Sequence, residues 1–383
     1  MIRALFVYRY CGRGGVEAAL RLRVTNLPLH GIEAHALFLH DANGSRDYRR
    51  LEGRVFFQAG EPAFAELLRS RRYEVISLID TFEVLDWIQA VAYEGAVIAE
   101  LQSTYPEALA ELHRLSSRRL GALLVPSRFQ ADWVRRHLDR SVRERLGIHV
   151  VPNFVDPGEF FPVSATTPPT GPKIVGWIGQ LDRLKNWRAF LDVADRLADR
   201  GDVEFWVVGG GASSEDSRRS FRLRVCNSRL ATTLRWWPSV PHRTMPLVYH
   251  LIAASGGVAT LTTRCESFGL AALEAMASGC PVVAPRVGAL PELIEHGVTG
   301  LLYRAQDTRR AARFVAMLLD HEDLRRELAS RAAARAIASF APGRCAAILA
   351  DVVQSVAGAH LGASSSAVAC KAQRSPVTER LPA

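Results

Sequence analysis

Several absences narrow what this 383-residue chain can be. Its six cysteines form no C-x-x-C pair and lack a histidine partner at zinc spacing, which argues against a disulfide framework or a zinc finger. No run of 18 apolar residues occurs, so no transmembrane helix is expected. Residues 1–8 become polar too soon for a signal peptide and predict a strand instead. We therefore expect a cytoplasmic protein with reduced thiols.

Lysine is also scarce, since only Lys173, Lys185 and Lys371 occur among 48 basic residues. The formal charge of +9 thus comes from arginine, and part of it reflects composition alone. Residues 111–145 hold nine arginines against four acids, and 129–138 has the pattern of a basic amphipathic helix. Such a face can dock peripherally on an anionic membrane, although an ordinary solvated helix fits the same pattern. No nucleic-acid motif accompanies the charge, so nucleic acid is not an expected partner.

Short apolar runs alternate with longer amphipathic segments along the whole chain. This alternation predicts an α/β fold with parallel sheets covered by helices on both faces. The expected strands of a first set are 4–8, 34–39, 54–57, 74–79, 96–101, 122–126 and 149–151. The helices between them are expected near 16–30, 61–71, 83–92, 107–115 and 128–145.

A proline-rich stretch around 157–172 interrupts the pattern, which then restarts. The second set of strands is expected at 173–178, 204–208, 233–236, 257–261, 282–284 and 300–303. We predict two doubly wound, Rossmann-like domains that face a central cleft, where a ligand would bind at the carboxyl ends of the strands. The predicted parts are an N-terminal domain over 1–165, a C-terminal domain over 166–340, a helix over 341–357 returning to the N-terminal domain, and a disordered tail over 358–383.

The segment 265–279 carries the most chemistry. Glu266 and Glu274 lie eight positions apart, the first in a loop and the second inside a predicted small-residue helix for which Ser267 is the expected N-cap. The start of a helix next to Gly269 favours an anion, and two carboxylates can hold two sets of hydroxyls. A solvated helix face could show the same spacing. A carboxylate among Ala, Leu and Met is costly to bury without a partner, which favours function.

Two glycine loops follow predicted strands. Gly14 and Gly15 lie between the first strand and the first helix, where backbone N–H groups can approach an anion, although a simple tight turn gives the same pattern. In the second domain, a loop after the strand 173–178 contains Gln180, Arg183 and Lys185. The two cations there could neutralise a leaving diphosphate, with ion pairing to a neighbouring helix as the alternative.

The sequence gives only weak signals for other catalytic or ligand-binding residues. No Asp-x-Asp motif occurs, so the usual aspartate device for a metal on a diphosphate is missing. Three histidines near predicted loops, His242, His250 and His296, are expected to be structural. Trp236 and Trp237 are expected in the core rather than as a platform for a base. The glycines 209–211 fit either a nucleotide border or a turn.

Together these residues resemble glycosyltransferase family 4, glycosyl transferases group 1, which are retaining enzymes of the GT-B fold. The segment from Glu266 to Glu274 is its most specific motif, and residues 151–156 with Phe160 resemble V-P-N-G-V-D-x-x-x-F. The stretches 288–294 and 297–302 resemble the segments that follow the two glutamates. The resemblance covers about residues 1–355.

The resemblance implies a metal-independent transfer of a hexose from a nucleotide-diphosphate sugar to a hydroxyl, with retention and without a cofactor. Glu266 and Lys185 would be catalytic, with Glu266 on the sugar hydroxyls and Lys185 on the phosphates. The other donor-binding residues would be Gly14, Gly15, Gln180, Arg183, Phe268, Gly269, Leu270 and Glu274. The acceptor would be a glycan, glycolipid or small molecule, in polysaccharide or glycoconjugate biosynthesis.

Two positions depart from the family. Gln180 stands where an arginine is usual, and Gln102 where the family often has a histidine. Glutamine can bind a hydroxyl but cannot shuttle a proton. We expect the acceptor near Asp80, Gln102 and Ser127. The departures keep two other hypotheses open: a catalytically weak or inactive binding or scaffold protein, and a nucleotide-sugar epimerase.

Overall fold

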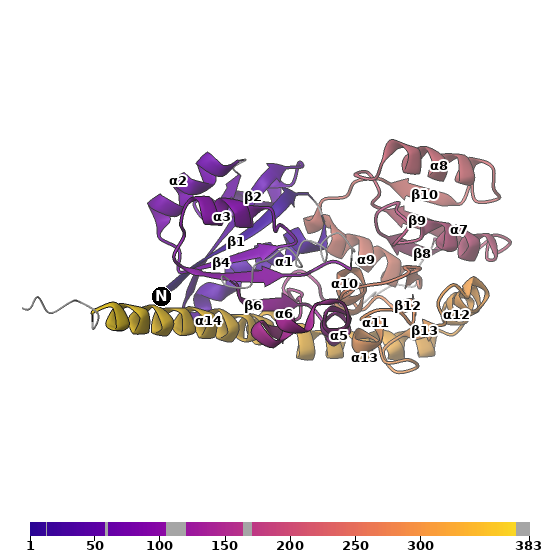
Figure 1. Cartoon of the computed structure of the whole chain (residues 1–383). Coiled ribbons are helices and arrows are strands. Elements are labelled where there is room, and N and C mark those ends of the chain that lie inside the picture. Colours follow the sequence, from indigo (N-terminus) through magenta and orange to yellow (C-terminus); the bar gives the residue numbers. More distant parts are fainter. Residues whose placement is uncertain (13, 58–59, 105–119, 164–170, 373–383) are drawn as a thin grey trace, which may run out of the picture.

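The structure is a computed structural model that describes residues 1–12, 14–57, 60–104, 120–163 and 171–372. Within these ranges the chain forms two parallel sheets, each with helices on both faces (Figure 1). The predicted helix near 107–115 lies outside the described residues.

The N-terminal sheet has seven parallel strands in the order β3-β2-β1-β4-β5-β6-β7. All seven predicted strands are confirmed. Their bounds are β1 Ile2–Cys11, β2 Ile32–Asp41, β3 Val55–Phe57, β4 Val75–Ile79, β5 Ala96–Glu100, β6 Leu120–Val125 and β7 Gly147–Val150. The middle strands consist almost entirely of buried apolar residues because helices cover both faces of the sheet.

The described helices of this domain match the predictions with two corrections and one element, η2, that was not predicted. They are α1 Gly15–Asn26, η1 Leu27–His30, η2 Ser45–Leu51, α2 Glu61–Arg71, α3 Val84–Ala90, α5 Arg128–His137 and α6 Arg140–Arg145. The predicted helix 16–30 ends as a 3-10 turn that contains Pro28. The predicted helix 128–145 breaks at Leu138, whose extended backbone buries its side chain in the core.

The C-terminal sheet has six parallel strands in the order β10-β9-β8-β11-β12-β13, and all six were predicted. They are β8 Lys173–Ile178, β9 Val203–Val208, β10 Leu234–Trp237, β11 Val258–Thr260, β12 Val282–Pro285 and β13 Leu301–Tyr303. The helices are α7 Trp187–Asp195, α8 Glu215–Cys226, η3 His242–Thr244, α9 Met245–Ala254, α10 Leu270–Ala277, α11 Leu290–Leu293, α12 Thr308–Asp320 and α13 Glu322–Phe340.

A long final helix, α14 Pro342–Ala372, leaves the C-terminal domain and runs along the N-terminal domain (Figure 1). Leu349, Val353 and Val356 on this helix are buried in the core that covers β1, β4 and β5. Among the described residues, the stretch 322–360 is long and apolar enough by composition to span a membrane, and 44% of its most apolar part is buried inside the protein. The disorder expected from residue 358 is corrected as far as Ala372, because the alanine-rich sequence favours continued helix.

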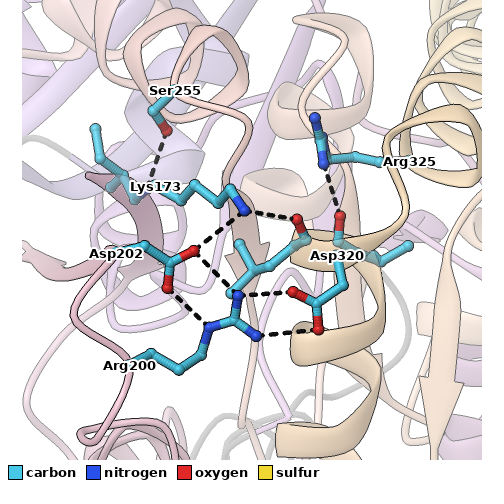
Figure 2. Close-up of polar contacts among 9 residues, drawn as sticks. Lys173, Arg200, Asp202, Ser255, Asp320 and Arg325 are labelled. Atoms are coloured by element: carbon cyan, nitrogen blue, oxygen red, sulfur yellow. Dashed lines mark hydrogen bonds and ion pairs between the residues drawn. The ribbon is translucent and has the colours of Figure 1, made fainter. Parts of the chain in front are cut away.

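A charged cluster ties the C-terminal domain together at the end of the sheet where β8 and β9 begin (Figure 2). Arg200 makes paired contacts with Asp202 and Asp320, the latter at 2.7 Å and 3.0 Å. Lys173 donates to Asp202 and also to the carbonyl of Leu319, near the end of α12. Cations at the carboxyl end of a helix are favourable, so this cluster is structural.

Candidate functional site

A cleft of about 300 Å³ lies between the two domains, beyond the carboxyl ends of β1 and β8. Both domains contribute to its walls, as expected for doubly wound sheets that face each other. From the N-terminal half its lining comprises Gly14, Gly15, Val16, Gln102 and Asn153. From the C-terminal half it includes Gln180, Lys185, His242, Glu266, Phe268, Gly269, Leu270 and Glu274.

Lys185 and Glu266 meet in this cleft. The Nζ of Lys185 lies 2.6 Å from Oε1 of Glu266, whose side chain is only 9% exposed. The backbone of Glu266 is fixed by the loop before α11, because Ala289 N donates to its carbonyl at 2.9 Å. A side chain at Gly288 would overlap the backbone of Glu266, and the φ of this glycine is +54°. The segment after the two-glutamate motif therefore positions the first glutamate.

The amino end of α10 opens into the cleft. Gly269 is its N-cap, with a φ of +98° and no side-chain cap. The predicted N-cap Ser267 is wrong, because its hydroxyl instead donates to the carbonyl of Gln102 in the other domain. Gly269, Leu270 and Ala271 line the cleft. The exposed N–H groups of a helix start carry partial positive charge and can bind an anion there.

Glu274 lies inside α10 and is 6% exposed, with a partner for each oxygen. His242 Nε2 is 2.8 Å from Oε1, and the hydroxyl of Tyr249 donates to Oε2 at 3.1 Å. Burial alone would lower the pKa of His242, but the carboxylate of Glu274 outweighs it and the pKa is raised. We had expected His242 to be structural. It lines the cleft and orients Glu274, and no spacing in the sequence indicated this pairing.

The glycine loop of the N-terminal domain faces this helix. A Cβ on Gly15 would lie 3.2 Å from the side chain of Leu270, so the two loops meet across the cleft. Glu17 on α1 accepts a hydrogen bond from Gly12 N at 2.9 Å, which closes the loop. Burial raises the pKa of Glu17.

Of the three residues predicted to bind the donor from the loop after β8, only Gln180 and Lys185 line the cleft. The Asp182 carboxylate accepts a hydrogen bond from Lys185 N at 2.6 Å and tightens the turn. Gln180 lines the cleft, and its Oε1 accepts a hydrogen bond from Ser213. Arg183 is exposed and lies outside the residues that line the cleft. Its predicted contact with the donor stays a prediction.

The three residues expected around the acceptor lie close to one another but play different parts. Gln102 lines the cleft, and its backbone N–H donates to Asp80 at 3.0 Å. Asp80 follows β4 with a φ of +44°, and burial raises its pKa to about 7. Ser127 does not line the cleft, since its hydroxyl donates to the carbonyl of Ser267 at 2.6 Å. It is a contact between the domains.

Glu292 was not predicted as a functional residue. Its carboxylate accepts hydrogen bonds from Arg128 N at 3.0 Å and Phe129 N at 2.6 Å. It therefore caps the start of α5 from the other domain, next to Ser127. The glutamate of the Gly-Ala-Leu-Pro-Glu stretch thus helps to set how the two walls of the cleft meet.

The remaining aromatic and glycine candidates are also placed. Trp236 packs against Phe221 and donates to the carbonyl of Gly209, and Trp237 packs against Trp206. Both tryptophans make ring contacts, but the expectation that they lie in the core is wrong for Trp237, which is exposed, and Trp236 is only partly buried. Gly209 borders the cleft with a φ of +105°, and a Cβ there would overlap the backbone of Gly179. Among the described residues no group of three His, Cys, Asp or Glu side chains could hold a metal ion.

Part of this sequence is similar to known proteins. Residues 172–321 match the family model described as glycosyl transferases group 1. A D-inositol 3-phosphate glycosyltransferase of Corynebacterium urealyticum is 33% identical over 168 residues, 43% of this chain and 39% of that protein. An N-acetyl-alpha-D-glucosaminyl L-malate synthase of Bacillus anthracis is 45% identical over 85 residues, 22% of each chain. The matches thus span less than half the length of these relatives.

Solved structures match over nearly the whole chain. HepE of Anabaena, solved in complex with UDP and glucose, has a TM-score of 0.78 at 19% identity, covering 93% of this chain and 100% of that one. Sucrose-phosphate synthase of Thermosynechococcus elongatus has a TM-score of 0.76 at 19% identity, covering 94% and 100%. These similarities give the fold, GT-B, as predicted.

Proposed function

We propose that this chain, which belongs to glycosyl transferases group 1 through its C-terminal domain, is a hexosyltransferase that uses a nucleotide-diphosphate sugar. The observation that carries the proposal is the cleft itself. The cleft has a volume of about 300 Å³, and one wall of it contains Glu266, Lys185, Glu274 and the amino end of α10. A solved protein of the same fold, HepE, is described in complex with UDP-glucose, which supports a donor of this class.

We assign each group of the donor a partner in the cleft. The diphosphate would lie against the start of α10 and Lys185, where helix N–H groups and a cation offset its charge. Glu266 would accept hydrogen bonds from sugar hydroxyls once Lys185 turns to the phosphate. Glu274, held by His242 and Tyr249, would accept from the ribose hydroxyls. Gly14 and Gly15 would border the phosphates from the other domain without a side chain in the way.

We further propose that transfer retains the anomeric configuration and needs no metal. The acceptor hydroxyl would attack from the face that the phosphate leaves, and the leaving phosphate would take its proton. The family resemblance supports retention, and the missing Asp-x-Asp motif supports metal independence. The anomer of the product by NMR tests retention, and a steady-state rate unchanged by EDTA tests metal independence.

A panel of nucleotide sugars tests the function directly. A donor that binds the native state raises the melting temperature by mass action, so thermal shift identifies the sugar and base. Transfer or hydrolysis of that donor then separates an enzyme from a binding or scaffold protein, which would bind without turnover. Isomerisation of the donor without an acceptor would indicate an epimerase instead. No binding by any member of the panel would contradict the proposal.

Cytoplasmic location and peripheral membrane contact remain proposals of the same kind. The exposed arginines of α5 and α6 include Arg135, Arg140 and Arg143. Arg135 pairs with Asp132 at 2.8 Å and Arg140 with Glu144 at 2.7 Å, which reduces the charge of this face. Sedimentation with phosphatidylserine vesicles should show binding that weakens with salt, and absence of binding at low salt would remove the idea.

A further inference from the structure

The N-terminal wall of the cleft contains a chain of buried polar side chains that starts at an ion pair. Arg23 on α1 is 1% exposed and Glu100 at the end of β5 is 0% exposed. The Nη1 of Arg23 donates to Oε2 of Glu100 at 2.6 Å, and the hydroxyl of Ser77 donates to Oε1 at 2.6 Å. The carboxylate of Glu100 is thus surrounded by donors, as a buried charge requires.

This carboxylate fixes the orientation of the two amides that follow it. A carboxylate only accepts, so Gln102 turns its amide nitrogen toward Oε2 of Glu100, at 3.3 Å. The carbonyl oxygen of Gln102 then faces Asn153, whose Nδ2 donates to it at 2.9 Å. Neither amide can be flipped without placing two acceptors or two donors against each other.

This series of hydrogen bonds ends on an acceptor that no donor in the described part of the protein reaches. Asn153 is 6% exposed and lines the cleft. Its Oδ1 has no hydrogen-bond partner among the described residues. A buried carbonyl oxygen without a donor is unfavourable, and a hydroxyl of a bound molecule would satisfy it. Phosphate oxygens would not, because they are acceptors themselves.

We propose that Oδ1 of Asn153 accepts a hydrogen bond from one hydroxyl of the transferred sugar, and that Arg23, Glu100 and Gln102 hold its amide in that orientation. This inference rests on the proposed function, because the sugar reaches Asn153 only as part of the donor in the same cleft. Asn153 is then a specificity-determining residue, and the other three are positioning residues. Gln102, expected to bind the acceptor, has both ends of its amide engaged by Glu100 and Asn153.

Deoxy analogues of the donor test the contact. UDP-glucose and its 2-, 3-, 4- and 6-deoxy forms are titrated into the wild type and Asn153→Leu, which has a similar shape but no acceptor. We expect one analogue to bind the wild type about tenfold more weakly than UDP-glucose. The variant should bind UDP-glucose about tenfold more weakly and no longer distinguish that analogue, while its ratios for the other three stay unchanged.

The possible outcomes separate the two proposals. If the wild type binds another donor of the panel instead, the deoxy series of that donor is used. If it binds none, the proposed function falls and this inference with it. If the donor binds but every analogue ratio is the same in both proteins, only this inference is overturned. A variant that changes the KM of the acceptor but not donor binding would assign Asn153 to the acceptor and overturn the donor assignment. Asn153→Ser replaces Asn153→Leu if the latter does not fold.

The positioning role of Gln102 has its own readout. Gln102→Leu removes both hydrogen bonds and frees the amide of Asn153, so we expect discrimination of the same hydroxyl to disappear. Gln102→His should restore it, because a neutral imidazole has one donor for Glu100 and one acceptor for Asn153. A merely structural role would predict lower melting temperatures without this loss and recovery of discrimination. Full discrimination in Gln102→Leu would overturn the positioning role.

Discussion

The two walls of the cleft are built on different principles. The C-terminal wall places Glu266, Lys185 and Glu274 on loops and one short helix, with each carboxylate paired at the rim of the cleft. The N-terminal wall has its charges farther inside, at Arg23 and Glu100, and among the described residues the polar side chains with which it lines the cleft are the amides of Gln102 and Asn153. A wall of charges suits a diphosphate and ribose, whereas a wall of fixed amides suits selection among neutral hydroxyls. Under the proposed function, the charges of the C-terminal wall bind the donor, whereas the charges behind the N-terminal wall hold the amides in their orientation.

The largest expected effect falls on the charged wall. Glu266→Ala and Lys185→Ala should each lower kcat/KM about a hundredfold or more, because each removes a charge that acts on the reacting groups. Arg183→Ala is the matched control, since Arg183 is on the same loop as Lys185 but is exposed and does not line the cleft. Steady-state kinetics on variants with wild-type melting temperatures checks this. An equal loss in Arg183→Ala would mean that the loop rearranges. Unchanged turnover in Glu266→Ala and Lys185→Ala would contradict a catalytic role for these two residues.

In the N-terminal wall of the cleft, the amide wall formed by Gln102 and Asn153, we expect the largest effect on the free energy of unfolding. Glu100→Gln leaves the buried guanidinium of Arg23 without its counter-charge, and we expect the free energy of unfolding to fall by about 3–5 kcal/mol. Glu144→Gln is the control, because the Arg140–Glu144 pair is exposed and should be worth about 0–1 kcal/mol. Urea unfolding measures both. Similar losses in the two variants would show that burial does not distinguish these pairs.

His242 should affect donor affinity and the pH dependence of stability. His242→Gln keeps a donor for Glu274 but loses the positive charge, so we expect donor Kd to rise about tenfold. The pKa of His242 is raised in the folded state, so its charge stabilises the fold fully below its ordinary value of 6.5. This contribution is lost as the pH rises through the raised pKa. Glu274 faces the imidazole, and Glu17, Arg21 and Glu159 lie near it.

Urea unfolding across pH measures this contribution. The stability difference between wild type and His242→Gln should be largest at acid pH and shrink toward alkaline pH. A difference that grows with pH would mean that the histidine is stabilising in its neutral form. His250→Gln is the control, because His250 contacts the carbonyl and the ring of Phe161, does not line the cleft and should leave donor binding unchanged.

The two sheets and the C-terminal wall of the cleft could be predicted from the sequence, whereas most of the N-terminal wall could not. Alternating apolar runs placed every strand, because buried parallel strands are apolar on both faces. The positions of Glu266, Glu274 and Lys185 in the cleft could be predicted because each lies in a short glycine-containing segment after a predicted strand. The amide wall could not, since Arg23, Glu100 and Asn153 come from distant segments that only the fold brings together. Gln102 was found through the resemblance, but its partners were not.

Local turns explain the other differences. Lys185 lines the cleft while Arg183, two residues before it, is exposed, and spacing in the sequence does not encode this difference. Ser267 has the right position and residue type for an N-cap. It contacts the other domain instead, and the left-handed backbone of Gly269 starts the helix. Contacts between domains thus override local propensity at the site.

The smallest expected effect concerns how the two walls are joined. Glu292 accepts from two backbone N–H groups at the start of α5, so Glu292→Gln loses a charge and one acceptor. We expect the free energy of unfolding to fall by about 1 kcal/mol, as for other helix caps. Urea unfolding at low and high salt measures it, and the loss should shrink with salt because the interaction is partly electrostatic.

Glu295→Gln is the matched control for this cap. Glu295 lies on the same segment but is 4.0 Å from Arg335 and largely exposed, so its loss should be within about 0.5 kcal/mol. Donor binding in Glu292→Gln carries the comparison further. If the charged wall binds the donor by itself, the Kd of the donor should stay near that of the wild type, while discrimination among deoxy analogues weakens as the amide wall shifts. A large loss of donor affinity with unchanged discrimination would mean that the cap serves the charged wall alone, and that the two walls do not divide the work as argued.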